Sequence, residues 1–178
     1  MELVQTAFGD GVLAKEATWQ ALVLIPKRNK DYRGIGLMEV VWKVVAAILN
    51  RRFTSSVTYH DALHGLRAGR GTGTTTLEAK VLQQLVAMRE EVLYLIFLDL
   101  TKSYDALERS RCLEILEDYG VGPNARRLLK TYWRRLTMVA RAGGYYGKAF
   151  KGERGVTQGD PLSPPYLMWW WTRSSGTG

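Results

Sequence analysis

The sequence predicts an α+β fold, and three observations carry that prediction. Residues 21–25 and 92–96 are short apolar runs, rich in β-branched or aromatic side chains as in strands. Residues 38–53 instead repeat apolar side chains at helical spacing. Clusters of glycine, proline and polar residues separate such segments. The length of 178 residues suits one domain or a piece of a larger one.

The first predicted elements are a hairpin and a helix. The strand over 21–25 stops at Pro26, a polar tip follows over 28–31, and residues 32–37 form the returning strand. The helix over 38–53 has one apolar face, with its basic residues off that face.

A polar connector over 54–76 contains three glycines and predicts no regular element. Threonines 74–76 cap a helix with an apolar face made by Leu77, Val81, Leu82 and Leu85. This helix leads into 92–96, which predicts a buried central strand ending at the carboxylate of Asp99.

The second half predicts two helices and a hairpin. One helix covers 108–118 and ends at Gly120, and the next begins at Pro123. Two strands, over 137–141 and 145–151, flank Gly143-Gly144. From Ser163 the chain opens as a helix does, but the tryptophan-rich tail resembles no folded element.

Composition bounds the classes of function. The formal net charge of +8 and the pI near 9.7 favour a polyanionic partner, although many soluble proteins carry such a charge. The single Cys112 excludes an internal disulfide and fits a reducing compartment. No apolar stretch reaches the length of a membrane helix, and the N-terminus has no signal-peptide pattern. We therefore expect an intracellular chain that uses no membrane.

Asp99 is the first candidate for chemistry. Nucleotidyl transfer needs divalent metals, and Mg²⁺ takes carboxylate and phosphate oxygens, so Asp99 and the carbonyl of Leu100 are candidate ligands. An Asp in this place also caps turns and helices, which stays the alternative. Tyr104 can lie under the sugar of a nucleotide; alternatively it is a core aromatic residue.

Two further segments contain candidate nucleotide-binding groups. The loop at Gln158-Gly159 exposes backbone that can approach a base pair or a phosphate, although a plain surface turn is the alternative. Lys27 and Arg33, on the two limbs of the first hairpin, can reach a triphosphate, or they are simply solvated.

Basic residues elsewhere suggest nucleic-acid contacts more weakly. Arg67 and Arg70, and the cations of the helix beginning at Pro123, can hold phosphate backbones or form solvated faces. His60 and His64 are four residues apart, but no Cys partner or third ligand accompanies them, so zinc binding is disfavoured.

Four segments in this order together resemble a reverse transcriptase of the non-LTR retroelement or group II intron type, over about residues 20–165. Ile25-Pro26-Lys27 with Tyr32-Arg33-Gly34-Ile35 resembles the fingers motif, with glycine in place of proline. Residues 64–72 are similar to the Gly-Phe-Arg segment of that family. Residues 97–107 resemble motif A, Asp-Leu-x-Lys-Ala-Phe-Asp, with Ser-Tyr for Ala-Phe. Residues 155–164 resemble motif B, Gly-x-x-Gln-Gly-x-Pro-Leu-Ser-Pro.

The resemblance implies a right-hand polymerase fold without a thumb. Residues 1–178 would be a partial reverse transcriptase domain, with fingers over about 20–90, a partial palm over about 91–165 and an aberrant tail over about 166–178. The implied partners are an RNA template, a DNA primer and deoxynucleoside triphosphates.

The resemblance also implies roles for single residues. The catalytic residue is Asp99, which with Leu100 would ligate Mg²⁺ in a two-metal mechanism. Tyr104 would be the gate against ribose 2′-hydroxyl groups. The triphosphate clamp would be Lys27 with Arg33, and contacts near the nascent base pair would come from Gln158 with Gly159. The template path would pass Arg67 and Arg70.

One departure from the family pattern limits the expected activity. The next family motif is an aromatic-x-Asp-Asp turn that provides the other metal-binding carboxylate, and no Asp-Asp pair occurs in this sequence. The leading hypothesis is therefore a fragment of an RNA-directed DNA polymerase that is inactive alone, with a tail that resembles a frameshift or truncation product. The alternatives are a non-catalytic basic nucleic-acid-binding module and a fragment that does not fold stably.

Overall fold

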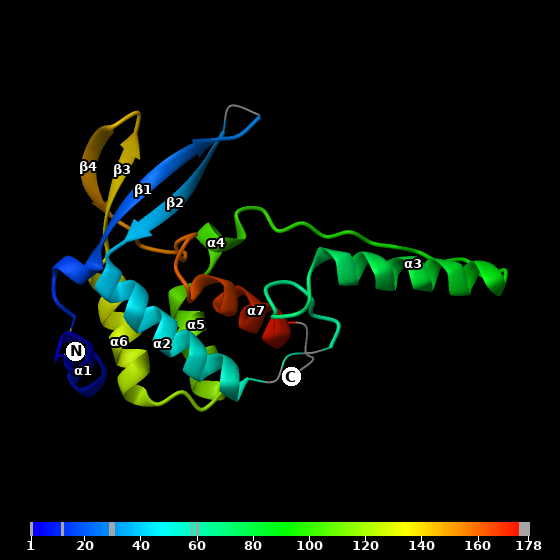
Figure 1. The fold of residues 1–178 in the computed structure, drawn as a ribbon, viewed down its shortest axis with the longest axis horizontal. Helices are drawn as coiled ribbons and strands as arrows, with labels where there is room; N and C mark the ends of the chain where they lie inside the picture. The colour runs from blue at the N-terminus through cyan, green and yellow to red at the C-terminus, as the bar shows by residue number, and fades with distance from the viewer. Residues whose placement is uncertain (1, 12, 29–30, 58, 60, 175–178) are drawn as a thin grey trace.

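The computed structural model describes residues 2–11, 13–28, 31–57, 59 and 61–174, and it confirms a mixed α and β architecture. A four-stranded sheet rises from the top of a cluster of helices, and one long helix extends from that cluster to the right (Figure 1). The helical cluster and the sheet are called the body below. The long helix and the extended chain that returns from it, residues 72–98, are called the arm.

The sheet is built from two hairpins, both predicted from the sequence. Strands β1 (Trp19–Pro26) and β2 (Tyr32–Met38) are antiparallel, as are β3 (Thr137–Ala142) and β4 (Tyr145–Lys151). The order is β2-β1-β3-β4, so the two hairpins join through a parallel pairing of β1 with β3. The sequence analysis predicted each hairpin but not this pairing, because no local pattern specifies which strand lies beside another.

Five helices surround the core of the body (Figure 1): α1 (Glu2–Asp10), α2 (Val40–Ser56), α5 (Arg109–Asp118), α6 (Pro123–Arg135) and α7 (Ser163–Ser174). A short 3-10 turn, η1 (Glu16–Thr18), precedes β1. Pro123 is the first residue of α6, where a missing N–H costs nothing, as predicted. Residues of all five helices are buried in one apolar cluster, which includes Ala7, Leu49, Leu116, Leu128 and Trp169.

The prediction for the tail was wrong. Residues Ser163–Ser174 form α7, and Tyr166, Met168 and Trp169 are buried. The rings of Tyr166 and Trp169 meet edge to face with centroids 5.7 Å apart, and Trp169 also contacts Phe53 of α2. A segment that reads as compositionally odd is stable here because its aromatic side chains find a partner surface on α2, α5 and α6.

The prediction of a buried central strand was also wrong. Residues 91–100 form no strand, and all ten are exposed, with Phe97 89% accessible. They return from the end of α3 (Thr72–Met88) alongside that helix (Figure 1). An extended segment needs a neighbouring strand to form a hydrogen-bonded ladder, and the four described strands pair only with one another.

Two smaller expectations concern metals and membranes. The imidazole of His64 lies between Thr74 Oγ1, at 2.8 Å, and Glu78 Oε2, at 3.0 Å, while His60 lies outside the described residues. No group of three or more potential metal-ligating side chains of His, Cys, Asp or Glu occurs among the residues described. Within the same part of the chain, no helix is both long and apolar enough to cross a membrane.

Candidate nucleotide-binding site

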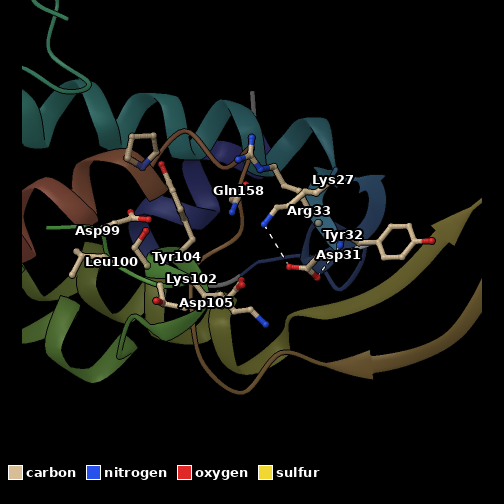
Figure 2. A pocket seen from close by; sticks show the side chains of 15 residues that line it. Lys27, Asp31, Tyr32, Arg33, Asp99, Leu100, Lys102, Tyr104, Asp105 and Gln158 are labelled. Carbon is tan, nitrogen blue, oxygen red and sulfur yellow. Dashed lines mark hydrogen bonds and ion pairs between the residues drawn. The ribbon is translucent and has the colours of Figure 1, made fainter. Parts of the chain in front are cut away.

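An open pocket of about 690 Å³ lies where three distant chain segments meet (Figure 2). The first segment is the tip of the β1–β2 hairpin, the second is the turn after the arm, and the third is the loop before α7. All seven residues that the sequence analysis assigned to the metal or the nucleotide line this pocket: Lys27, Arg33, Asp99, Leu100, Tyr104, Gln158 and Gly159. The volume lies in the range of small-molecule sites, about 300–1,000 Å³.

The hairpin holds its two cations on neighbouring limbs. Ile25 pairs with Arg33 and Pro26 with Tyr32, and the N–H of Lys27 donates to the carbonyl of Asp31 at 2.8 Å. The ammonium group of Lys27 lies 3.7 Å from the Asp31 carboxylate, which is the ion pair drawn in Figure 2. A hydrogen bond from the Tyr32 N–H and the charge of Lys27 lower the pKa of Asp31. Both groups are solvent-exposed, so this pair contributes little to stability.

The turn after the arm contributes Asp99, Leu100 and Tyr104. Asp99 is exposed, so its carboxylate is accessible from solvent and from the pocket. Lys102 has a left-handed backbone, φ 51°, and immediately precedes the short helix α4 (Ser103–Ala106). Such a conformation is uncommon for a residue with a side chain and often occurs at functional sites. Partial burial raises the pKa of Tyr104, which keeps its hydroxyl protonated.

The loop before α7 is packed against both other segments. On one side, the N–H of Gly155 donates to Leu107 O at 2.9 Å and the N–H of Val156 to Tyr104 O at 2.8 Å. On the other side, the N–H of Gly36 donates to Gln158 O at 2.8 Å. These bonds join the loop to α4 and to β2 at the same time.

Two glycines allow this close approach. Gly155 and Gly159 have φ of 77° and 107°, a region that favours glycine. A Cβ atom on Gly155 would lie 2.8 Å from the Cα of Asp105, and one on Gly159 would lie 2.8 Å from the carbonyl oxygen of Gly36. The glycines of the motif B pattern are therefore needed where the loop touches its two neighbours.

The donor set fits a Mg²⁺ ion that is shared with a substrate. The carboxylates of Asp99 and Asp105 and the carbonyl-bearing Leu100 line one pocket. The third acid of the pocket, Asp31, is paired with Lys27, and no group of three or more His, Cys, Asp or Glu side chains among the described residues is placed to hold a metal ion. Mg²⁺ is commonly held by one or two carboxylates together with substrate phosphates and water. The cations Lys27, Arg33 and Lys102 supply the matching charge for such phosphates.

Comparison with known proteins decides the family. A family model described as "Reverse transcriptase (RNA-dependent DNA polymerase)" matches residues 25–169. The chain belongs to the reverse transcriptase family. This is a family of RNA-directed DNA polymerases, a class of nucleotidyltransferases.

Three curated proteins similar to this chain come from mobile elements. The chain is 25% identical over 138 residues to the retrovirus-related Pol polyprotein from type-2 retrotransposable element R2DM of Drosophila melanogaster, covering 78% of this chain and 13% of that protein. It is 27% identical over 157 residues to the corresponding polyprotein from type-1 retrotransposable element R2 of Popillia japonica, covering 82% and 22%. The Transposon TX1 uncharacterized 149 kDa protein of Xenopus laevis is 26% identical over 166 residues, covering 88% and 12%.

These relatives confirm the resemblance to reverse transcriptases of the non-LTR retroelement type. The chain spans less than a quarter of the length of any of the three.

Two residues assigned to the template path of the reverse transcriptase lie outside the pocket. Arg70 contacts the backbone and the carboxylate of Asp61, and the guanidinium of Arg67 donates to Leu63 O at 3.2 Å and lies over the ring of Tyr59. Both arginines fold the connector onto itself, and their contact with a template stays a prediction.

The cations of α6 also divide between two roles. Arg126 pairs with Glu117 at 2.6 Å, and Arg135 donates to Leu13 O at 3.0 Å, so these two hold the body together. Lys130 and Arg134 instead line a shallow surface pocket beside Lys151.

The sequence assigned no role to three charged residues that line the pocket: Asp31, Lys102 and Asp105. Lys102 and Asp105 belong to the motif A pattern, so the sequence could have indicated that they lie near Asp99. Asp31 had none, because only the closed hairpin turns it toward Lys27.

Proposed function

We propose that this chain is the nucleotide-binding part of a retroelement RNA-directed DNA polymerase, with fingers over about residues 20–90 and part of a palm over about 91–165. One observation carries the proposal: the hairpin, the turn after the arm and the loop before α7, which are far apart in sequence, converge on one pocket (Figure 2). The family match spans all three segments except the beginning of the hairpin.

Different residues of the pocket bind different parts of a deoxynucleoside triphosphate. Lys27 and Arg33 bind the phosphates through charge-assisted hydrogen bonds, and Asp99 with the carbonyl of Leu100 faces the metal-bound side. Tyr104 closes the pocket under the sugar and excludes a 2′-hydroxyl group. Gln158 and Gly159 lie where the nascent base pair would stack.

Magnesium, when bound with the triphosphate, would neutralise charge that develops during nucleotidyl transfer. The residues of this chain bind and orient the nucleotide, while the second metal-binding carboxylate of the family pattern is absent from its sequence. The RNA template and the DNA primer would meet the basic surface outside the pocket, which includes Lys130, Arg134 and Lys151.

Nucleotide binding tests this proposal directly. Equilibrium dialysis with labelled dGTP and Mg²⁺ should show binding to the 178-residue chain. Lys27→Ala and Arg33→Ala should each weaken it about tenfold, because each removes a hydrogen bond to a charged group. Arg28→Ala is the matched control, since Arg28 is a cation of the same hairpin that does not line the pocket. Equal effects of all three substitutions would contradict the proposal.

Primer extension tests the expected incompleteness. The chain alone should not extend a DNA primer on an RNA template in Mg²⁺ above the level of an Asp99→Asn variant, because one carboxylate site cannot supply the two-metal stabilisation. Extension by the unaltered chain that the Asp99→Asn variant lacks would show that the site is complete without the Asp-Asp turn.

A further inference from the structure

Asp160 is an acid of the motif B loop that lies outside the pocket. Its side chain is only 7% exposed, and no ion pair to it occurs in the described part of the chain. Burying a carboxylate without a cation is unfavourable, so its hydrogen bonds must hold it in place. The two carboxylate oxygens accept from different parts of the structure.

One oxygen has a local role and the other a long-range one. Oδ1 accepts from the N–H of Leu162 at 2.9 Å, within the turn that starts α7. Oδ2 accepts from the indole N–H of Trp42 at 2.8 Å, and Trp42 belongs to α2. A residue that only started the helix would need Oδ1 alone. The second bond ties the loop to another element.

Trp42 is itself fixed. Its ring is fully buried and stacks on Tyr132 of α6, with centroids 3.4 Å apart and an interplanar angle of 6°. The hydroxyl of Tyr132 accepts a hydrogen bond from the amide of Gln20 in β1. Burial, and after it the carboxylate of Asp160, raises the pKa of Tyr132 and of Tyr166. Asp160 is therefore attached to a buried aromatic pair in the core of the body.

The loop is attached at Gln158 and at Asp160, with Gly159 between these two points. The carbonyl of Gln158 accepts from Gly36 of β2, and the Gly159 backbone presses on the same glycine. Two residues later, Asp160 is bonded to α2. With both ends held, the side chain of Gln158 enters the pocket from one fixed direction (Figure 2).

We propose that Asp160 is a positioning residue, which holds Gln158 and Gly159 against the incoming nucleotide through its bond to the indole of Trp42. This inference rests on the proposed function for its consequence in nucleotide binding. The attachment of the loop is independent of that function and can be measured without nucleotide.

A double-mutant cycle on the 178-residue chain separates these claims. In Asp160→Asn the oxygen of the amide still accepts from Leu162, but its NH₂ group opposes the indole N–H, so two donors face each other. Trp42→Phe removes that N–H and keeps an aromatic ring against Tyr132. Glu91→Gln is the matched control, because Glu91 is an exposed acid of the arm that forms no ion pair in the described part of the chain. The readouts are hydrogen exchange of the Gly36 amide, the dissociation constant for dGTP with Mg²⁺, and the thermal midpoint.

We expect Asp160→Asn to speed exchange of the Gly36 amide and to weaken dGTP binding, each by about tenfold, as for loss of one buried bond to a charged group. The double variant should recover part of both losses, because phenylalanine no longer presents a donor to the amide. Glu91→Gln should change neither.

Three results would overturn the inference. The first is unchanged Gly36 exchange in Asp160→Asn. The second is strictly additive losses that match the fall in global stability, which would make Asp160 a structural residue only. The third applies if Asp160→Asn does not fold. In that case Trp42→Phe alone tests the inference, and unchanged exchange of the Gly36 amide in Trp42→Phe would overturn it. Absence of dGTP binding by the unaltered chain would instead contradict the proposed function, while exchange at Gly36 would still test the attachment.

Discussion

Helices α2 and α3 both have 17 residues and both carry periodic apolar side chains, yet they have opposite environments. Helix α2 buries Trp42, Val45, Ala46, Leu49 and Phe53 in the core of the body, whereas α3 has no buried residue. The difference shows that apolar periodicity specifies a helix and one face of it. It does not specify whether another surface covers that face.

The two helices differ because of what lies next to them. The body surrounds α2 with the α1 and α6 helices, the sheet and the aromatic side chains of α7. Near its start the arm contacts the connector, where the imidazole of His64 lies against Thr74 and Glu78. Beyond that point, Leu82, Leu85 and Met88 are exposed, and so is the returning segment with Ile96 and Phe97. An exposed extended segment of this composition is a surface prone to pairing with another strand.

The largest expected loss of stability comes from the tail, which packs into the core of the body as α2 does. Trp169 is 1% exposed and donates through its indole N–H to Tyr59 Oη at 3.0 Å. Trp169→Ala should lower the free energy of unfolding by about 3–5 kcal/mol, the usual cost of truncating a buried tryptophan. Urea unfolding followed by circular dichroism measures this. Trp171→Ala is the control, since Trp171 is 41% exposed in the same helix, and equal losses would mean that the tail is not packed.

A matched pair of leucines tests the comparison itself. Leu49 of α2 is 1% exposed and Leu82 of α3 is 51% exposed. Leu49→Ala should cost about 2–5 kcal/mol, because it leaves a cavity, whereas Leu82→Ala should stay within about 0.5 kcal/mol. The same unfolding experiment gives both values. A large loss for Leu82→Ala would show that the arm is packed in solution, against some surface of the same or another chain.

The smallest expected effect is a change of stability with pH, and it comes from Asp160, which is buried in the body. Burial, only partly offset by the hydrogen bonds from Leu162 and Trp42, raises the pKa of Asp160. The folded state then keeps this proton at a higher pH than the unfolded chain does. Its contribution to stability is present at low pH and is lost as the pH rises through the folded-state pKa.

Unfolding measurements between about pH 4 and about pH 8 on the chain and on Asp160→Asn isolate this contribution. As the pH rises, the free energy of unfolding of the unaltered chain should fall relative to that of Asp160→Asn, because the amide of the variant cannot ionise. Parallel curves would mean that Asp160 titrates as in the unfolded chain.

Local elements of the body were predictable from sequence because their signals are local. The β1–β2 hairpin, α5, α6 and the β3–β4 hairpin follow from strand-length runs, the Gly143-Gly144 turn and Pro123. The partner of each element was not predictable. Residues 92–96 have the composition of a buried strand, but no strand lies beside them, and the tail that reads as unfolded is covered by α2 and α5.

The candidate site was predictable as a set of residues through the order of four motifs, and its geometry was not. Lys27, Asp99 and Gln158 meet because the sheet and α4 hold the loop from both sides. The hydrogen bond between Asp160 and Trp42 could not be predicted from the sequence, since Trp42 is one aromatic residue on a helix face. Long-range hydrogen bonds of this kind depend on the packed structure rather than on spacing along the chain.

The parallel pairing of β1 with β3 has a consequence for the order of folding during synthesis. The β1–β2 hairpin is complete once residue 38 has been made, but Trp19 pairs with Thr137, so the middle of the sheet must wait for a much later segment. Such a distant contact closes slowly and leaves the early hairpin with one open edge in the meantime. The nascent chain therefore exposes this edge until the β3–β4 hairpin emerges, and the pocket forms only after the loop at 155–160 has followed.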